Sequence, residues 1–271
     1  MKSIDGITCK KELEFALFHI SDLTSEIKAL LKGQLSYICY GRSCSLSGHE
    51  LFNYTNTLKE FIARYENKSN DIQVGMIGEL IAHVIINEFF GEYDVASPFF
   101  NKEERSIKKG FDVILSKKED RSLWITEVKS GGLHKDKDSN KTAIDLLGSA
   151  KRDLIKRLNE ENRSLWLNAI NDAKNAFENH VDLKDSIVEI LAGYGLRAGT
   201  EAASSSNDHN VFLVSALFAP LGDTIRAKTI KDRARIISEE NAFDRLFIMS
   251  IQKGTHKKVY EFLKQESKMR G

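Results

Sequence analysis

A segment between Val74 and Phe89 carries apolar side chains around most of the circumference of a predicted helix. A helix that is apolar on nearly every side has to be surrounded by other elements, so the chain must fold around it. One acidic residue, Glu79, lies inside this helix, one turn before His83. Because a buried carboxylate is costly without a cation or a hydrogen-bond donor, Glu79 needs a partner. A structural salt bridge and a functional site would both meet that need.

Two short predicted strands that each carry an acidic residue follow this helix. The first strand, Gly110 to Leu115, contains Asp112, and the second, Leu123 to Lys129, contains Glu127. The charged turn between them predicts a hairpin. Side chains alternate along a strand, so Glu127 and Lys129 point to the same face. The charged groups of the two strands can therefore share one site.

This combination of residues suits hydrolysis of a phosphodiester bond. Asp112 and Glu127 offer hard oxygen ligands for Mg²⁺, for which Mn²⁺ can substitute. Lys129 can orient the attacking water or help deprotonate it, and can offset the charge that builds on phosphorus. Glu79 can complete the metal shell directly or through water. An isolated Glu-x-Lys triplet is common by chance, so the prediction depends on the ordered set of helix and strands.

The ordered set resembles the core of the PD-(D/E)XK nucleases, through Glu79 in a helix, Gly110 to Asp112, and Ile125 to Lys129. Phe111 replaces the proline that commonly precedes the first acidic residue. More narrowly, the whole chain resembles the HamA family, the nuclease subunits of the Hachiman anti-phage defence system, through Gly78 to Leu80 and the same two strands. The resemblance implies a metal-dependent deoxyribonuclease. It also implies a superfamily 2 helicase partner (HamB-like) that meets abnormal or invading DNA and triggers the cut.

The overall charge gives no indication of a nucleic-acid partner, since 40 Lys and Arg residues face 39 Asp and Glu residues. Contacts with DNA must therefore be local. The predicted helix after Lys141 directs a basic set outward, with Lys151 and Arg152 as the candidate DNA contacts and Lys156 and Arg157 beside them. Exposed basic residues on a helix are more often simply solvated. The chain has no GxxxxGK[ST] loop, so a nucleotide-driven step would come from a partner.

Other site classes find little support in the sequence. The seven histidines show no paired-ligand spacing, which makes a zinc site unexpected. The three cysteines form no CxxC pair, and no signal peptide precedes them, so we expect a reduced cytoplasmic setting. The longest apolar runs, such as Val211 to Leu221, are too short to cross a bilayer.

We expect an α/β fold with a mixed central sheet flanked by helices, as in restriction endonucleases. Residues 1–70 are predicted to form a mainly helical N-terminal part that offers a partner interface, and residues 71–271 a nuclease core with a C-terminal extension. The individual predicted elements are a helix at Lys10 to Lys32, a strand at Leu35 to Tyr40, a helix at Leu51 to Tyr65, a mobile Ser-rich loop at Ala202 to Asn207, strands at Val211 to Ala219 and Arg245 to Gln252, and a helix at His256 to Ser267.

Two other functions remain open. A catalytically inactive, nuclease-like module would bind DNA or a helicase partner through the same acidic, basic-rimmed surface. A purely structural subunit would place Asp112, Glu127 and Lys129 in scattered surface salt bridges. The form of the DNA, the sequence preference, the number of metal ions, the trigger and the oligomeric state are not decided by the sequence.

Overall fold

The computed structural model describes residues 3–100, 110–160, 163–177, 181–198 and 205–269. Its strands are β1 (Ile7–Lys11), β2 (Phe15–Ile20), β3 (Tyr93–Val95), β4 (Val113–Lys117), β5 (Leu123–Gly132), β6 (Asn210–Phe218) and β7 (Arg245–Lys253). Its helices are α1 (Ser25–Tyr40), α2 (Arg42–Ser45), α3 (Tyr54–Glu66), α4 (Asn70–Phe89), α5 (Ser139–Asn159), α6 (Arg163–Ala176), α7 (Val181–Arg197), α8 (Ala227–Glu239) and α9 (Lys257–Met269), with short 3-10 turns η1 (Glu50–Phe52) and η2 (Ser206–Asp208).

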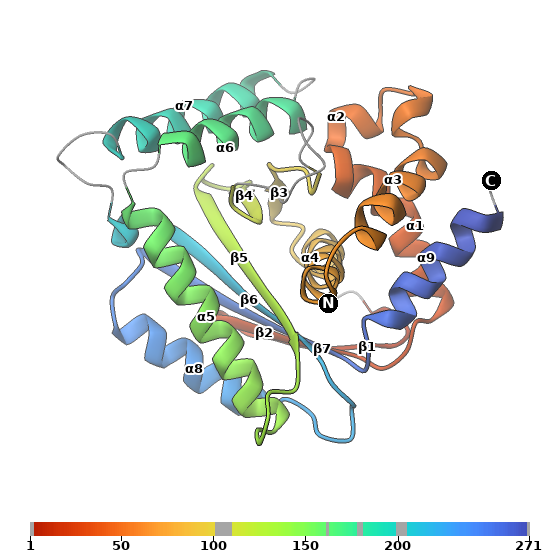
Figure 1. Ribbon diagram of the computed structural model, residues 1–271. Helices are drawn as coiled ribbons and strands as arrows, with labels where there is room; N and C mark the ends of the chain where they lie inside the picture. Colours follow the sequence, from red (N-terminus) through yellow and green to blue (C-terminus); the bar gives the residue numbers. More distant parts are fainter. Residues whose placement is uncertain (1–2, 101–109, 161–162, 178–180, 199–204, 270–271) are drawn as a thin grey trace.

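The strands form one mixed sheet in the order β1-β2-β7-β6-β5-β4-β3 (Figure 1). Strands β2, β7, β6 and β5 run parallel to their neighbours within this group. The flanking strand β1 pairs antiparallel with β2, β4 pairs antiparallel with β5, and β3 pairs antiparallel with β4. The predicted α/β class with a mixed sheet flanked by helices is confirmed.

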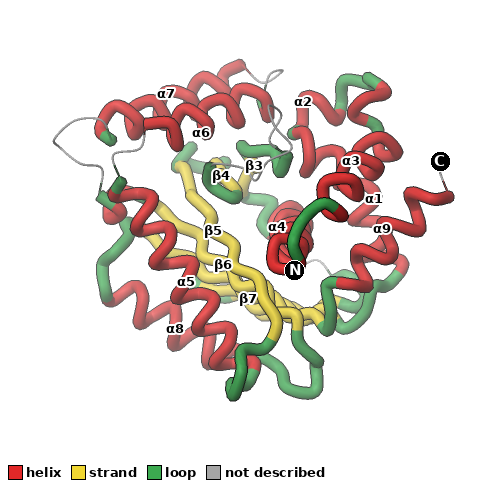
Figure 2. The backbone as a smooth tube through the Cα atoms, in the orientation of Figure 1, coloured by secondary structure: helices red, strands yellow, loops and turns green. Residues whose placement is uncertain are grey.

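Helices cover both faces of the sheet, which gives the protein two apolar cores (Figure 2). Helices α1, α3, α4 and α9 enclose one core, and α5, α6, α7 and α8 enclose the other. Strand β6 lies between the cores: Phe212 and Val214 face the first, while Val211 and Leu213 face the second. All nine residues of β6 are buried, because a central parallel strand with helices on both sides has no solvent-facing side.

The predicted secondary structure near the N-terminus is wrong in two places. The segment expected to be a helix from Lys10 to Lys32 begins as the hairpin β1–β2 and becomes helical at Ser25, and the strand expected at Leu35 to Tyr40 belongs to α1. Residues 15–20 are almost entirely buried in parallel pairing with β7, so a tertiary partner overrides the helical spacing. Thr24 caps α1 by accepting a hydrogen bond from the Ile27 N–H.

The remaining predicted elements correspond to α3, α4, β4, β5, α5, β6, β7 and α9, with boundaries that differ by a few residues. In the Ser-rich segment, residues 202–204 lie outside the described residues, and Ser206–Asp208 forms η2. Elements that precede residue 70 share one apolar core with α4, since Phe18, Leu35 and Phe61 belong to the same cluster as Ile77.

Among the described helices, α4 has the length and apolar composition that would allow it to cross a membrane, and half of its most apolar window is buried inside the fold. Its position explains this composition. Figure 1 shows α4 between the sheet and the helices α1 and α3, and its buried residues belong to the first core. The sequence-based prediction of a helix that must be surrounded by other elements is confirmed.

Candidate active site

The hairpin of β4 and β5 brings the two acidic residues together. Val113 pairs with Thr126, and continuing this antiparallel register places Asp112 opposite Glu127. Glu127 lies two residues after Ile125 of the second core, so its side chain is on the face of the sheet that α5 covers, and the charge of the nearby Asp112 acts on it. A second link ties the strands, because Asp112 Oδ2 accepts a hydrogen bond of 2.7 Å from the Val128 N–H.

Glu127 is completely buried and lies between two cations. Its Oε1 is 2.8 Å from Lys129 Nζ, and its Oε2 accepts a hydrogen bond of 2.9 Å from the Arg157 guanidinium. Burial, followed by the nearby charge of Asp112, raises the pKa of Glu127 to about 7 although Arg157 and Lys129 act in the opposite direction. The carboxylate is therefore held in a position where its negative charge is incompletely balanced.

Lys129 has two acidic partners. Its Nζ lies 2.8 Å from Glu127 Oε1 and 2.8 Å from Asp153 Oδ2. Burial lowers the pKa of Lys129, but the charges of Glu127 and Asp153 outweigh this effect and leave the pKa above its usual value. An ammonium group, rather than a neutral amine, faces the carboxylates.

Two of the residues that complete this network, Asp153 and Arg157, were not predicted as site residues. Both belong to α5, one turn apart, and Arg157 also donates a hydrogen bond of 3.2 Å to the Gly110 carbonyl. The expectation that Arg157 points outward into solvent is wrong. A signal for both was present, because Asp153 and Arg157 continue the stripe of Leu146 and Ala150, whose side chains face the sheet.

Glu79 is placed apart from the other three predicted site residues. Gly78, its neighbour in α4, lies against Ser130, on the face of β5 opposite to Glu127 and Lys129. Glu79 is partly exposed, and its Oε1 is 3.9 Å from Nε2 of the buried His83. Within the described ranges, which include Glu79, Asp112 and Glu127, no three acidic, histidine or cysteine side chains are grouped closely enough to hold a metal ion.

The two candidate DNA contacts differ in their surroundings. Lys151 is mostly buried and forms an ion pair with Glu240, at the end of α8. Arg152 is exposed and donates a hydrogen bond of 3.0 Å to Ser149 on the same helix. The charge of Arg152 is therefore accessible to solvent, while Lys151 is paired with an acidic residue of the protein itself.

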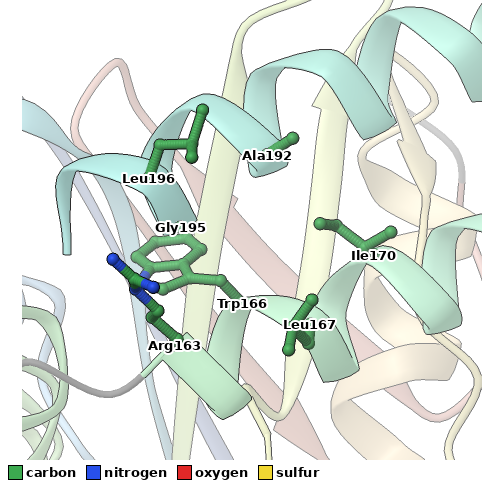
Figure 3. Close-up of a pocket in the computed structure, with 7 residues that line it drawn as sticks. All are labelled: Arg163, Trp166, Leu167, Ile170, Ala192, Gly195 and Leu196. Carbon is green, nitrogen blue, oxygen red and sulfur yellow. The ribbon is translucent and has the colours of Figure 1, made fainter. Parts of the chain in front are cut away.

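A cavity of about 390 Å³ lies between α6 and α7, away from these charged residues. Figure 3 shows its lining residues, which are mainly apolar and contain no carboxylate: Arg163, Trp166, Leu167, Ile170, Ala192, Gly195 and Leu196. Trp166 connects this region to the site, because its ring centroid is 5.1 Å from that of Phe111, the residue before Asp112. Trp166 therefore packs against the segment that carries Asp112, and the lining of the cavity supplies no carboxylate, histidine or cysteine for acid–base or metal chemistry.

Comparison with known proteins identifies the family. The model of the HamA family matches residues 5–267, which is nearly the whole chain. A search of curated proteins found no match. The match spans the hairpin with Asp112, Glu127 and Lys129 as well as both terminal regions. The chain therefore belongs to the HamA family and is a component of a Hachiman defence system.

Proposed function

We propose that this chain is the nuclease of its defence system and cleaves DNA by metal-dependent hydrolysis of phosphodiester bonds. One observation carries the proposal: a completely buried glutamate, Glu127, lies close to a second acidic residue, Asp112, and beside Lys129. The pKa of Glu127 is raised to about 7, and clusters of ionisable residues with a strongly shifted pKa are typical of functional sites. A purely structural subunit would instead be expected to hold these charges in scattered surface salt bridges.

The residues present suit a magnesium ion. Asp112 and Glu127 are hard oxygen donors, and Mg²⁺ is commonly bound by one or two protein carboxylates while it keeps several waters. The charge of Asp112 contributes to the raised pKa of Glu127, so a cation placed between them would relieve their repulsion. Glu127 Oε2 is occupied by Arg157, so Oε1, which lies 2.8 Å from Lys129 Nζ, is the oxygen suited to a metal. Glu79 would have to act from a distance, through water.

The bound ion would act as a Lewis acid toward a phosphate oxygen and lower the pKa of a bound water. The other functions fall to side chains of the chain itself. Asp112 and Glu127 would hold the ion on the face of the sheet below α5. Lys129, with its raised pKa, would act as a cation that orients water and offsets the charge developing on phosphorus, rather than as a base.

We also propose that a superfamily 2 helicase partner releases the activity when it meets abnormal or invading DNA. Membership of the HamA family supports a partner within the Hachiman system. The nuclease has to be restrained, because an unrestrained nuclease without sequence preference would damage the DNA of its own cell.

The direct test is cleavage of supercoiled and linear DNA with Mg²⁺ or Mn²⁺, with and without the helicase partner. The native chain is compared with Asp112→Ala and Lys129→Ala. Matched controls are Glu119→Ala, in the exposed turn between β4 and β5, and Lys156→Ala, on the exposed side of α5; these side chains are 79% and 78% exposed.

We expect the native chain and both control variants to nick DNA in the presence of the metal, and both site variants to lose this activity. Dependence on the helicase would support the restraint. If the native chain never cuts DNA with its partner and DNA ends present, or if the site variants cut equally well, the nuclease assignment fails. DNA or helicase binding without cleavage would then identify an inactive, nuclease-like binding module.

A further inference from the structure

Helix α5 contributes two charged side chains to the site through contacts of different kinds. The Arg157 guanidinium donates to Glu127 Oε2 at 2.9 Å and to the Gly110 carbonyl at 3.2 Å. It therefore joins the second acidic residue to the backbone just before Asp112. The Asp153 carboxylate lies 2.8 Å from Lys129 Nζ. The Lys129 ammonium therefore contacts both Asp153 and Glu127.

The two carboxylate oxygens of Glu127 contact different residues. Oε2 accepts the hydrogen bond from Arg157, whereas Oε1 is buried and lies 2.8 Å from Lys129 Nζ. A guanidinium is planar and always charged, and its fixed N–H directions can hold two acceptors at once. Because Arg157 holds both Oε2 and the Gly110 carbonyl, it restrains the Glu127 carboxylate with Oε1 on the side of Lys129.

Lys129 has a second partner that it can keep. If a cation takes Glu127 Oε1, the ammonium of Lys129 would be repelled from its present position, but Asp153 holds it from the other side. Asp153 is half exposed, so its own charge is partly solvated and available for this role. The spacing of Asp153 and Arg157 by one helical turn places both contacts on the same side of α5.

We propose that Arg157 and Asp153 are positioning residues of the metal site: Arg157 clamps Glu127 so that Oε1 faces the ion, and Asp153 retains Lys129 beside it. This inference rests on the proposed metal-dependent function. Residues that orient metal ligands from behind typically change metal affinity or activity by about 10- to 100-fold when they are altered. The two residues are expected to affect different measurements.

The first experiment measures binding of Mn²⁺ alone to the full chain by isothermal titration calorimetry, without DNA. Arg157→Lys keeps the positive charge but loses the fixed two-acceptor geometry, so we expect the dissociation constant to rise by on the order of tenfold. Arg152→Lys is the matched control, because it makes the same substitution on the exposed side of the same helix, and it should bind Mn²⁺ like the native chain.

Asp153→Asn tests the second half of the proposal and, at a half-exposed position, does not depend on whether Arg157→Lys folds. Its dissociation constant for Mn²⁺ should stay within about twofold of the native value, while cleavage at saturating Mn²⁺ falls by on the order of tenfold. This separation of metal affinity from turnover would not follow from a merely structural role.

The results distinguish a failure of the proposed metal-dependent function from a failure of the roles of Arg157 and Asp153. If the native chain binds no Mn²⁺, the proposed metal-dependent function fails, and this inference fails with it. If the native chain binds Mn²⁺ and Arg157→Lys binds it equally well or more tightly, only the role of Arg157 is overturned. Unchanged cleavage by Asp153→Asn at saturating Mn²⁺ would overturn the role of Asp153.

Discussion

Asp112 Oδ2 accepts a hydrogen bond of 2.7 Å from the backbone N–H of Val128, so the first acidic residue is tied to the strand of the second through the main chain. The donor, Val128, lies between Glu127 and Lys129 in β5. It gives Asp112 a structural task in addition to the charge that the proposed chemistry requires.

Replacing Asp112 with Asn should separate these two tasks. The Asn side chain has an oxygen that can still accept from Val128, so Asp112→Asn should unfold in urea with nearly the native free energy of unfolding. Asp112→Ala leaves the N–H without this acceptor and should lose about 1 kcal/mol. Neither variant should cleave DNA, because both lack the charge. Equal stability of the two variants would show that the hydrogen bond contributes nothing.

The buried carboxylate of Glu127 should make the free energy of unfolding of the metal-free protein depend on pH. Its pKa is raised from 4.5 to about 7, so between these values the folded chain keeps a proton that the unfolded chain has lost. Stability contributed by this group therefore falls as pH rises through that window.

The measurement is the free energy of unfolding of the native chain minus that of Glu127→Gln, in the presence of a chelator. The difference should decrease from about pH 4.5 to about pH 7 and then level off. His209, whose pKa is lowered to about 4 by burial, gains stability over a similar range but is common to both proteins and cancels. A flat difference curve would contradict the raised pKa.

Helix α4 should tolerate no side chain at Gly78. A Cβ added there would lie 1.8 Å from Ser130 Oγ and 2.7 Å from Ser130 Cβ, so Gly78→Ala should destabilise the protein by about 1–3 kcal/mol through overpacking. Gly75→Ala is the matched control on the same helix, with no atom within 4 Å of its new Cβ, and should be neutral or stabilise by up to about 1 kcal/mol.

Thermal unfolding of the two alanine variants measures this difference, and Gly78→Ala combined with Ser130→Gly should recover part of the loss. If Gly78→Ala melts at the temperature of Gly75→Ala, α4 does not approach β5 as closely as the structure has it.

The two adjacent basic residues of α5 should respond differently in a DNA-binding assay. Arg152 is exposed, so Arg152→Ala should weaken binding and reduce the salt dependence by about one unit of slope, as expected for the loss of one phosphate contact. Lys151 is paired with Glu240, so Lys151→Ala should leave the slope unchanged. Fluorescence anisotropy of a labelled duplex at several salt concentrations measures both slopes, and a reversed order would contradict this assignment.

The parts of the fold that the sequence predicted are those determined by local patterns. The periodicity of α4 and the alternation in the β4–β5 hairpin concern residues close in sequence, and the same hairpin brings Asp112 close to Glu127. The N-terminal strands could not be predicted in this way. The segment from Phe15 to Ile20 becomes a strand because it pairs with β7 near the other end of the chain.

The same reasoning applies to the candidate site. Glu127 and Lys129 follow from strand alternation and Asp112 from the predicted hairpin, whereas Asp153 and Arg157 enter through the packing of α5, the helix after β5, onto the sheet. A polar continuation of an apolar stripe indicated their position, but the identity of their partners depends on the tertiary structure. For Glu79, the sequence predicted only that a carboxylate in an apolar helix needs a partner. It did not indicate on which face of the sheet that partner would lie.

The order of the strands also has a consequence for synthesis of the protein. Strand β2 is synthesised well before its parallel neighbour in the sheet, β7, because β3 to β6 and α1 to α8 lie between them in the sequence. A nascent chain that has not reached Arg245 can form the local hairpin of β4 and β5, but β2 and β6 still lack the strand that lies between them. For the proposed nuclease, assembly of the central sheet and of any activity that depends on it is therefore delayed until β7 has been synthesised.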